Sequence, residues 1–377
     1  MALINYLTRV HFGDGVLQEA IHAEIERCAL KHPFILLENR DELTELEEFT
    51  LAAINNSYIE KTIAHAPLFP EENRLKRSAD LYKSKGCDAI IAIGGSQVMH
   101  YAKLVRLCIG SDKSIERFSE FTGGQRLFKQ SNMPLFIAAP NLFGIAPCIS
   151  KYSRVLLKDG KYDSFASCRL RADIAICDPL FSLKDTSTDI SASAAEALVL
   201  CLEAYFSSGF NPPADGIAID GLRRINNHAD QLGSGNCDLD CRRELMIANL
   251  SGVLALEKGR GACSVITDFL MTREGNSLSE GQIKRAVMSK VLSKPSQEIA
   301  EKLNELKSIF QLDVDAAGYF EALFNKLGMF GEFSQNGQNF GPSFDFQPIN
   351  ANAHAHFYAL PKEYNTLLKS LGAVQVH

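Results

Sequence analysis

The sequence predicts an α/β fold in two parts: a doubly wound parallel sheet in residues 1–180 and an all-helical domain in residues 181–377. Short apolar runs alternate with amphipathic segments through the first part, as in a series of βαβ units. Beyond Ser191 the strand signal fades, and helical periodicity dominates from Glu196 to Leu327. With 377 residues, 46% of them apolar, the chain is long enough to bury the cores of about two domains.

The first part alternates predicted strands and helices in order. Three of the predicted strands, residues 34–37, 89–93 and 174–177, are short continuous apolar runs, which are typical of strands buried on both faces of a parallel sheet. The strongest run is AIIAI at residues 89–93. The predicted strands are residues 10–12, 34–37, 89–93, 134–140 and 174–177, and helices are predicted at residues 16–31 and 71–85.

The net charge, the hydropathy and the cysteine content of the chain indicate what kind of molecule the protein binds. A formal net charge of −6 and a pI near 5.9 give no field that attracts nucleic acid or an anionic membrane, so we expect a small-molecule substrate. No run of about 18 apolar residues predicts a membrane span, and the first residues predict a strand and a turn, so we expect a cytoplasmic protein. The ten cysteines form no regular framework, which suits thiols in a reducing compartment. The closest pair, Cys237 and Cys241, has no partner at zinc-finger spacing.

Two glycines, Gly94 and Gly95, stand where the strongest predicted strand meets a helix. Glycine lets the backbone approach a pyrophosphate closely, and a helix N-terminus offers free N–H groups and a partial positive charge. An ordinary strand-to-helix turn has the same two glycines, so they favour a nucleotide site without establishing one.

The stretch around Glu196 joins the two predicted domains. A buried strand ends at Cys177, the chain turns, and a helix runs from about Ser191 to Tyr205 before prolines prevent its continuation. Residues 196 and 200 are one turn apart, the spacing at which a helix presents two ligands to one metal ion. Here they are Glu196, which can bind a metal, and Leu200, which cannot.

This stretch resembles the signature of the group III, iron-containing alcohol dehydrogenases, which reads DPxL, a spacer, DALxHxIEAY and NPxxD. The resemblance implies a Rossmann-like domain followed by a helical domain, as in the dehydroquinate synthase-like fold. It also implies NAD(P)-linked interconversion of alcohols and aldehydes, and a homodimer. The matching residues are Asp178, Pro179, Leu198, Glu203, Ala204, Tyr205, Asn211, Pro212 and Asp215.

The resemblance also identifies the residues at the family's four metal-ligand positions. Glu196 replaces an aspartate, and Leu200, Ser264 and Glu280 replace histidines. Iron or zinc needs about three good nitrogen, sulfur or oxygen ligands, so this set predicts that neither is bound. The remaining histidines offer no replacement cluster, because the pair His354 and His356 lies far along the chain.

The family's cofactor loops are also altered. In the GGGSxxDxAK loop Gly94 and Gly95 match, as do Ala102 and Lys103, whereas Ser96, Gln97 and His100 replace glycine, serine and aspartate. A second loop, PTTAGTGSE in the family, keeps Pro140 and Gly144 but has Asn141 and Leu142 in place of hydroxyl donors. At the family's acidic ribose-binding position we place Asn39, with Glu38 as the alternative. Loss of that carboxylate beside Arg40 would favour NADP over NAD.

Two functional hypotheses follow, with a slight preference for the first. The first is an NAD(P)-linked alcohol dehydrogenase without catalytic iron or zinc, in which His100, Glu196, Asp268 or Glu280 supplies the proton. The second is a non-catalytic relative that keeps the scaffold for binding or assembly. A third reading, a dehydroquinate synthase-like lyase, needs histidines that the sequence does not place.

Overall fold

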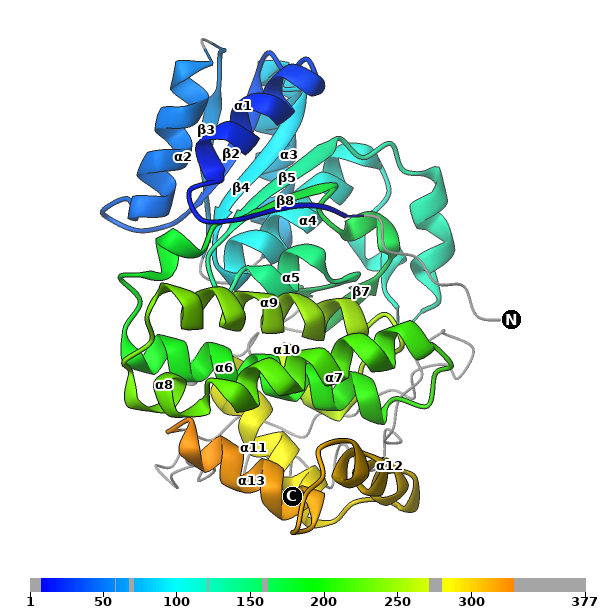
Figure 1. Ribbon diagram of the computed structural model, residues 1–377. Helices are drawn as coiled ribbons and strands as arrows, with labels where there is room; N and C mark the ends of the chain where they lie inside the picture. The colour runs from blue at the N-terminus through cyan, green and yellow to red at the C-terminus, as the bar shows by residue number, and fades with distance from the viewer. Residues whose placement is uncertain are drawn as a thin grey trace. The chain divides into compact units, whose positions relative to one another are not determined.

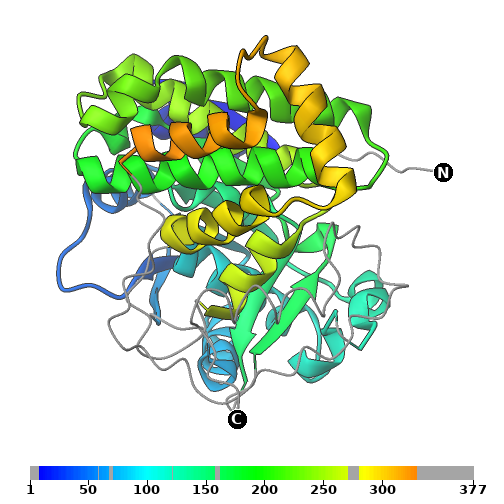
Figure 2. The ribbon, with the colours of Figure 1, turned by 90° about the horizontal axis from the view of Figure 1, so that it is seen from below.

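A computed structural model describes residues 8–57, 59–67, 71–120, 122–157, 162–270 and 280–328 of the chain. Its contacts divide the chain after Lys184 into two compact units. The predicted boundary is at residue 180. The helices and strands of each unit can be followed in Figure 1 and, from below, in Figure 2.

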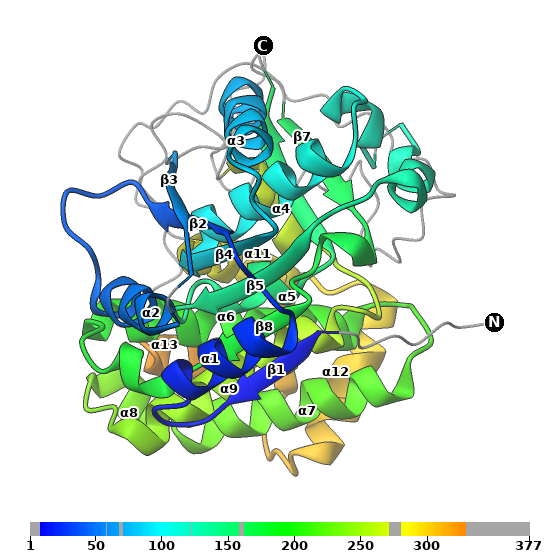
Figure 3. The ribbon, with the colours of Figure 1, turned by 90° about the horizontal axis from the view of Figure 1, so that it is seen from above.

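The N-terminal unit is built on a six-stranded sheet in the order β1-β8-β5-β4-β2-β3, in which every pair of neighbouring strands is parallel (Figure 3). The five predicted strands are all present. The sixth, β3, is missed because its exposed and half-buried residues form no apolar run. The strands are β1 (Arg9–Phe12), β2 (Pro33–Glu38), β3 (Thr62–Ala66), β4 (Ala89–Gly94), β5 (Leu135–Pro140) and β8 (Ile174–Cys177).

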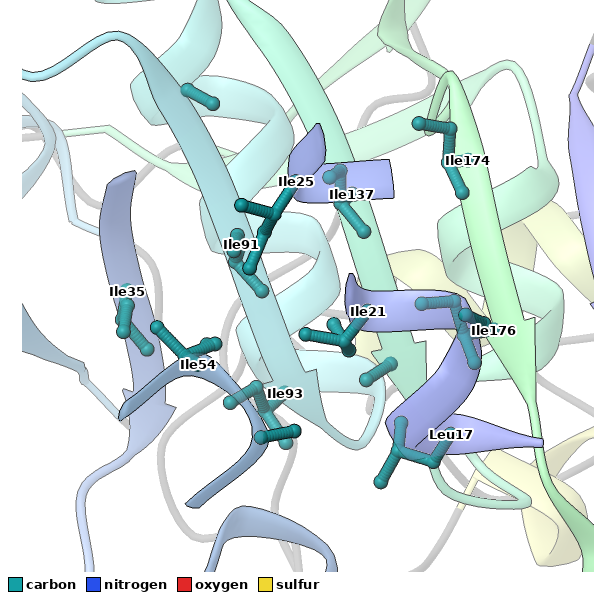
Figure 4. Close-up of a cluster of buried hydrophobic side chains, with 14 of the residues drawn as sticks. Leu17, Ile21, Ile25, Ile35, Ile54, Ile91, Ile93, Ile137, Ile174 and Ile176 are labelled. Atoms are coloured by element: carbon teal, nitrogen blue, oxygen red, sulfur yellow. The ribbon is translucent and has the colours of Figure 1, made fainter. Parts of the chain in front are cut away.

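The central strand β4 is buried along its whole length, which explains why its sequence is continuously apolar. Its alternate residues Ile91 and Ile93 lie in one core with apolar residues of α1 and α2. Figure 4 shows Ile21 of α1 and Ile54 of α2 in this cluster beside the isoleucines of the sheet. The helices of this unit are α1 (Leu17–Arg27), α2 (Glu45–Asn56), α3 (Glu72–Lys85), α4 (Ser96–Gly110) and α5 (Ile145–Ile149).

An antiparallel hairpin, β6 (Tyr152–Leu156) and β7 (Tyr162–Ala166), stands apart from the main sheet. The sequence prediction does not contain it, because its strands carry Arg154, Asp163 and serines where a buried strand usually has apolar residues. These polar side chains are buried nonetheless. The hairpin contacts α4, whose N-terminus follows the Gly94–Gly95 turn.

The second unit is helical throughout its described part, as the periodicity predicts (green to orange in Figure 2). Its central helix α6 packs against α7, α9, α10 and α11. It begins at Ser187, four residues before the predicted start, because Thr186 and Asp189 form a capping box. The helices are α6 (Ser187–Phe206), α7 (Pro212–Asn227), α8 (Ala229–Ser234), α9 (Leu239–Ala255), α10 (Ala262–Leu270), α11 (Glu280–Ser293), α12 (Gln297–Ile309) and α13 (Ala316–Lys326).

Cys237 and Cys241 are joined as a disulfide at the start of α9, whereas eight other cysteines are free. The cysteines expected to be thiols from their apolar runs, Cys108, Cys177, Cys201 and Cys263, are among the free ones, whereas Cys237 lies just before the Asp238 cap of α9 and Cys241 in the first turn of the helix. In the part of the chain that the structure describes, no helix combines the length and the hydropathy that a membrane span requires.

Candidate functional site

The carboxyl ends of β2, β4 and β5 lie side by side at one edge of the sheet, because Gly94 pairs with Pro140 and Leu36 with Ala92. Ligands of open parallel sheets bind at this edge. The Glu38 carboxylate at the end of β2 accepts a hydrogen bond of 2.6 Å from the backbone N–H of Gly95. The β2 end and the glycine turn therefore form one site.

The Gly94–Gly95 turn requires glycine for two reasons. Gly94 has φ of +127°, a conformation that residues with a side chain rarely adopt, and a Cβ on either glycine would lie 2.9 Å from Oε1 of Glu38. Helix α4 then starts at Ser96 with no side-chain cap at its N-terminus. Ser96 and Gln97 are half-buried there. A glycine turn at the start of a helix is a common phosphate-binding arrangement, and here the Glu38 carboxylate accepts the Gly95 N–H.

The loop after β5 packs directly on this turn. Asn141 N–H donates to the carbonyl oxygen of Gly94 at 3.1 Å, and the Asn141 side-chain oxygen accepts from Phe143 and Gly144 at 3.0 and 3.1 Å. Leu142 is buried, so its side chain packs in the core. A Cβ on Gly144 would lie 2.3 Å from the Gly94 carbonyl oxygen, so glycine is needed for this close approach.

Buried cations join α4 to the β6–β7 hairpin. The Lys103 ammonium donates to the carbonyl oxygens of Ser150 and Tyr152 at 2.7 and 2.8 Å. Arg154, which is 1% exposed, donates to the Ser96 hydroxyl at 3.4 Å. His100 is also buried, with Nδ1 3.3 Å from the Ser153 hydroxyl. His100 thus contacts the hairpin in the N-terminal unit, whereas the three acidic candidates belong to the helical unit.

The motif residues that carry the resemblance have structural roles in this chain. The Asp178 carboxylate accepts from the backbone N–H groups of Gly15 and Leu17 at 2.9 and 3.1 Å, so it fixes the start of α1. Asp215 pairs with Lys258 at 2.5 Å, and Lys258 also donates to the Tyr205 carbonyl oxygen. These contacts explain why the signature identifies a fold more securely than it identifies a reaction.

Three helices of the helical unit bring acidic residues around one lysine. Glu196 of α6 accepts a hydrogen bond from the ammonium of Lys284 on α11, and both side chains are buried. Glu280, one turn before Lys284, has its carboxylate 3.7 Å from the same ammonium. Burial disfavours the charge on Lys284, but Glu196, Glu280 and Asp268 outweigh it and raise the pKa of Lys284.

A second buried carboxylate, Glu203, lies two turns after Glu196 on α6. It accepts from the backbone N–H groups of Gly261 and Ser264 at 2.8 and 3.0 Å, and from the Ser264 hydroxyl. Burial raises the pKa of Glu203, although these hydrogen bonds and the charge of Lys284 act in the opposite direction. The Asp268 carboxylate pairs with Arg260 at 2.9 Å.

The donor atoms that the described part of the chain places here do not suit iron or zinc. Leu200 has no donor atom and packs on α9 at Gly252, and the Ser264 hydroxyl is hydrogen-bonded to Glu203. Lys284 places a positive charge against Glu196, the first of the four ligand positions. Among the described residues, no group of three or more His, Cys, Asp or Glu side chains is placed to hold a metal ion. His354 and His356 lie outside the described residues.

Many of the predicted site residues lie in two groups, one at the sheet edge and one around Lys284. Gly94, Gly95, Asn141 and Gly144 meet at the sheet edge, but Asn39 is exposed and Glu38 lies against the turn in its place. Of the two residues considered for the ribose-binding position, Asn39 and Glu38, it is therefore the Glu38 carboxylate that lies beside the glycine turn. In the helical unit Glu196, Glu280 and Asp268 all influence Lys284.

Sequence reasoning missed Lys284, Glu203 and Arg260 as members of the cluster. One signal was available for Lys284, because it follows Glu280 by four residues and so shares its face of a helix. No comparable signal links Lys284 to Glu196, which lies 88 residues earlier.

Comparison with known proteins agrees with this architecture. Residues 8–179 match the family described as iron-containing alcohol dehydrogenase. The 4-hydroxybutyrate dehydrogenase of Cupriavidus necator is 28% identical over 295 residues, which is 78% of this chain and 76% of that protein.

Solved structures share the fold along nearly the whole chain. An alcohol dehydrogenase from Oenococcus oeni aligns with a TM-score of 0.79 at 16% identity, covering 98% of this chain and 100% of that one. A 1,3-propanediol oxidoreductase aligns with a TM-score of 0.78 at 17% identity and covers the same shares. At this level of identity the likeness establishes the fold alone.

Proposed function

We propose that the chain is a member of the iron-containing alcohol dehydrogenase family and an NAD-linked oxidoreductase that interconverts a short hydroxy acid and the corresponding semialdehyde. Members of this family are dehydrogenases, and the 28% identity to a 4-hydroxybutyrate dehydrogenase supports the substrate class. The observation that carries the cofactor proposal is the contact between Glu38 and the Gly94–Gly95 turn.

The residues at the sheet edge suit a dinucleotide. Gly94 and Gly95 let the backbone turn tightly into the N-terminus of α4, the end of a helix that favours a phosphate, and the Glu38 carboxylate lies against this turn. Bound NAD would accept the hydride from the alcohol carbon. The role of this part of the chain is to bind and orient the dinucleotide.

Glu38 favours NAD over NADP. A carboxylate at the end of this strand can accept a hydrogen bond from a ribose 2′-hydroxyl, and it repels a 2′-phosphate. Arg40 is the residue that could neutralise a 2′-phosphate, but its guanidinium is already paired with Glu38 at 2.7 Å. The preference for NADP expected from Asn39 is therefore replaced by a proposed preference for NAD.

Replacing Glu38 with glutamine should weaken this preference. Glu38→Gln keeps an oxygen that can accept from Gly95 but removes the negative charge and frees Arg40, so we expect the ratio of NADPH to NADH affinity to rise about tenfold, a change of about 1.4 kcal/mol. Fluorescence titration of the purified chain with both nucleotides measures this ratio. Glu42→Gln, which removes a charge from an exposed residue nearby, is the control and should leave it unchanged.

The same titrations test the function itself. The proposal expects NADH to bind and NAD to be reduced when 4-hydroxybutyrate is added, with 1-butanol, which has the same chain length without the carboxylate, as the slower substrate. If neither NADH nor NADPH binds, the proposal is wrong, and the non-catalytic alternative becomes the better account.

The family resemblance also underlies two proposals about assembly and location, namely a homodimer and a cytoplasmic protein. Light scattering of the purified chain measures the first directly. A monomeric mass at micromolar concentration would contradict it.

A further inference from the structure

The strongest unassigned feature is the buried acidic cluster around Lys284. Glu196 on α6 accepts a hydrogen bond from this ammonium, the Glu280 carboxylate lies 3.7 Å from it, and two further buried carboxylates, Glu203 on α6 and Asp268 on α10, belong to the same unit. Side chains of this kind are rarely buried unless they are paired, because removing a charge from water costs several kcal/mol. A buried group of acidic residues therefore needs a cation, and here the chain supplies one.

Close packing of α11 on α6 places that cation. A Cβ on Gly281 would lie 2.3 Å from the carbonyl oxygen of Ala192, so only glycine lets the two helices approach this closely at the start of α11. Lys284 follows by less than one turn, and Glu196 follows Ala192 by one turn on α6. The side chains of Lys284 and Glu196 therefore meet between the helices, with 6% and 2% of their surfaces exposed.

The position of the ammonium conflicts with a divalent metal. A metal bound by Glu196 would sit about 2.0–2.2 Å from a carboxylate oxygen, in the region where Lys284 donates its hydrogen bond. Two cations a few ångströms apart in a buried site repel strongly. Of the other carboxylates, Glu203 is bound by the start of α10, and Asp268 is paired with Arg260.

We propose that Lys284 is a built-in cation that takes the electrostatic place of a divalent metal, so that the helical unit binds neither iron nor zinc at the Glu196 cluster. The positive charge of Lys284 on α11 then neutralises part of the negative charge of Glu196 and Glu280, which would otherwise attract a metal ion. For the proposed oxidoreductase activity, this implies turnover that does not depend on a metal and is insensitive to chelators. The metal-binding part of the inference does not rest on that activity.

A specific consequence is a latent cation site. Without the ammonium, Glu196 and Glu280 become two buried carboxylates that face the same vacated space. Carboxylate oxygens suit a hard ion such as Mn²⁺. The variant Lys284→Met should therefore gain an affinity for Mn²⁺ that the natural chain lacks.

The experiment uses the full chain, purified without a metal-binding tag. Elemental analysis of the natural chain should find less than about 0.1 equivalent of iron or zinc, because the Lys284 ammonium occupies the position beside Glu196 that a metal would need. Added Mn²⁺ should leave its melting temperature unchanged, whereas that of Lys284→Met should rise by roughly 3 °C or more at saturating Mn²⁺. The double variant Lys284→Met with Glu196→Gln is the matched control and should lose this response.

Several outcomes would overturn the proposal. Near-stoichiometric iron or zinc in the natural chain would do so, as would a response to Mn²⁺ that is equal in the natural chain and in Lys284→Met. If Lys284→Met does not fold in the absence of Mn²⁺, the yield of folded protein after refolding is measured with and without Mn²⁺. A yield that Mn²⁺ does not raise contradicts the latent site. These measurements need no turnover, and NADH binding is scored separately, so failure of this inference is distinguishable from failure of the proposed function.

Discussion

Lys284→Met should lower the free energy of unfolding by about 3–5 kcal/mol, the cost of leaving a buried charge without its partner. Methionine is unbranched like lysine and only one heavy atom shorter, so little packing is lost. Glu196 would retain its burial and lose the ammonium that donates to it. Chemical denaturation followed by circular dichroism measures the change.

Two variants identify the cause of this loss. Lys290→Met removes a lysine from an exposed position of the same helix and should change the free energy of unfolding by less than about 0.5 kcal/mol. Adding Glu196→Gln to Lys284→Met removes both members of the pair and should recover a large part of the loss. A double variant less stable than Lys284→Met would show that the pair is not the source of the effect.

The pH dependence of stability gives an independent check. The neighbouring carboxylates hold the pKa of Lys284 in the folded chain above its ordinary value of 10.5. A raised folded pKa means that the stabilisation is fully present below the unfolded pKa and is lost as the pH rises through the folded value. The stability difference between the natural chain and Lys284→Met should therefore be constant near neutral pH and should decrease above about pH 10.5.

Gly144→Ala should disrupt the nucleotide edge of the N-terminal unit. The added methyl group would lie 2.3 Å from the Gly94 carbonyl oxygen and 2.8 Å from the Pro140 ring, so the loop after β5 must move away from the glycine turn. Gly144 has φ of −86°, which alanine adopts freely, so the effect is steric. We expect a loss of about 1–3 kcal/mol in stability and at least about tenfold weaker NADH binding.

Gly216→Ala is the matched control for this substitution. Gly216 lies on an exposed face of α7, and a Cβ there meets no atom within 4 Å. Alanine should be neutral or stabilise the helix by up to about 1 kcal/mol. Calorimetry and NADH titration of both variants test the comparison, and a Gly144→Ala protein with natural stability and affinity would show that the loop tolerates the shift.

The parts of the fold that the sequence predicted are those whose signal lies within one element. The continuous apolar run of β4 and the helical periodicity beyond Ser191 both depend on neighbours a few residues away. The β6–β7 hairpin escaped prediction because its polar side chains, Arg154 among them, are buried through contacts with α4. A local pattern contains no record of those contacts.

The candidate site divides in the same way. The sequence by itself determined that a glycine turn follows the central strand, and the family resemblance predicted that Leu200 and Ser264 stand where the family has histidines, since both statements concern single positions. Only the tertiary structure decided that Glu38 lies against Gly95, 57 residues away, and that Lys284 lies against Glu196, 88 residues away. Charged side chains interact according to their distance in space. That distance is set by how helices and strands pack, and no short stretch of sequence encodes this packing.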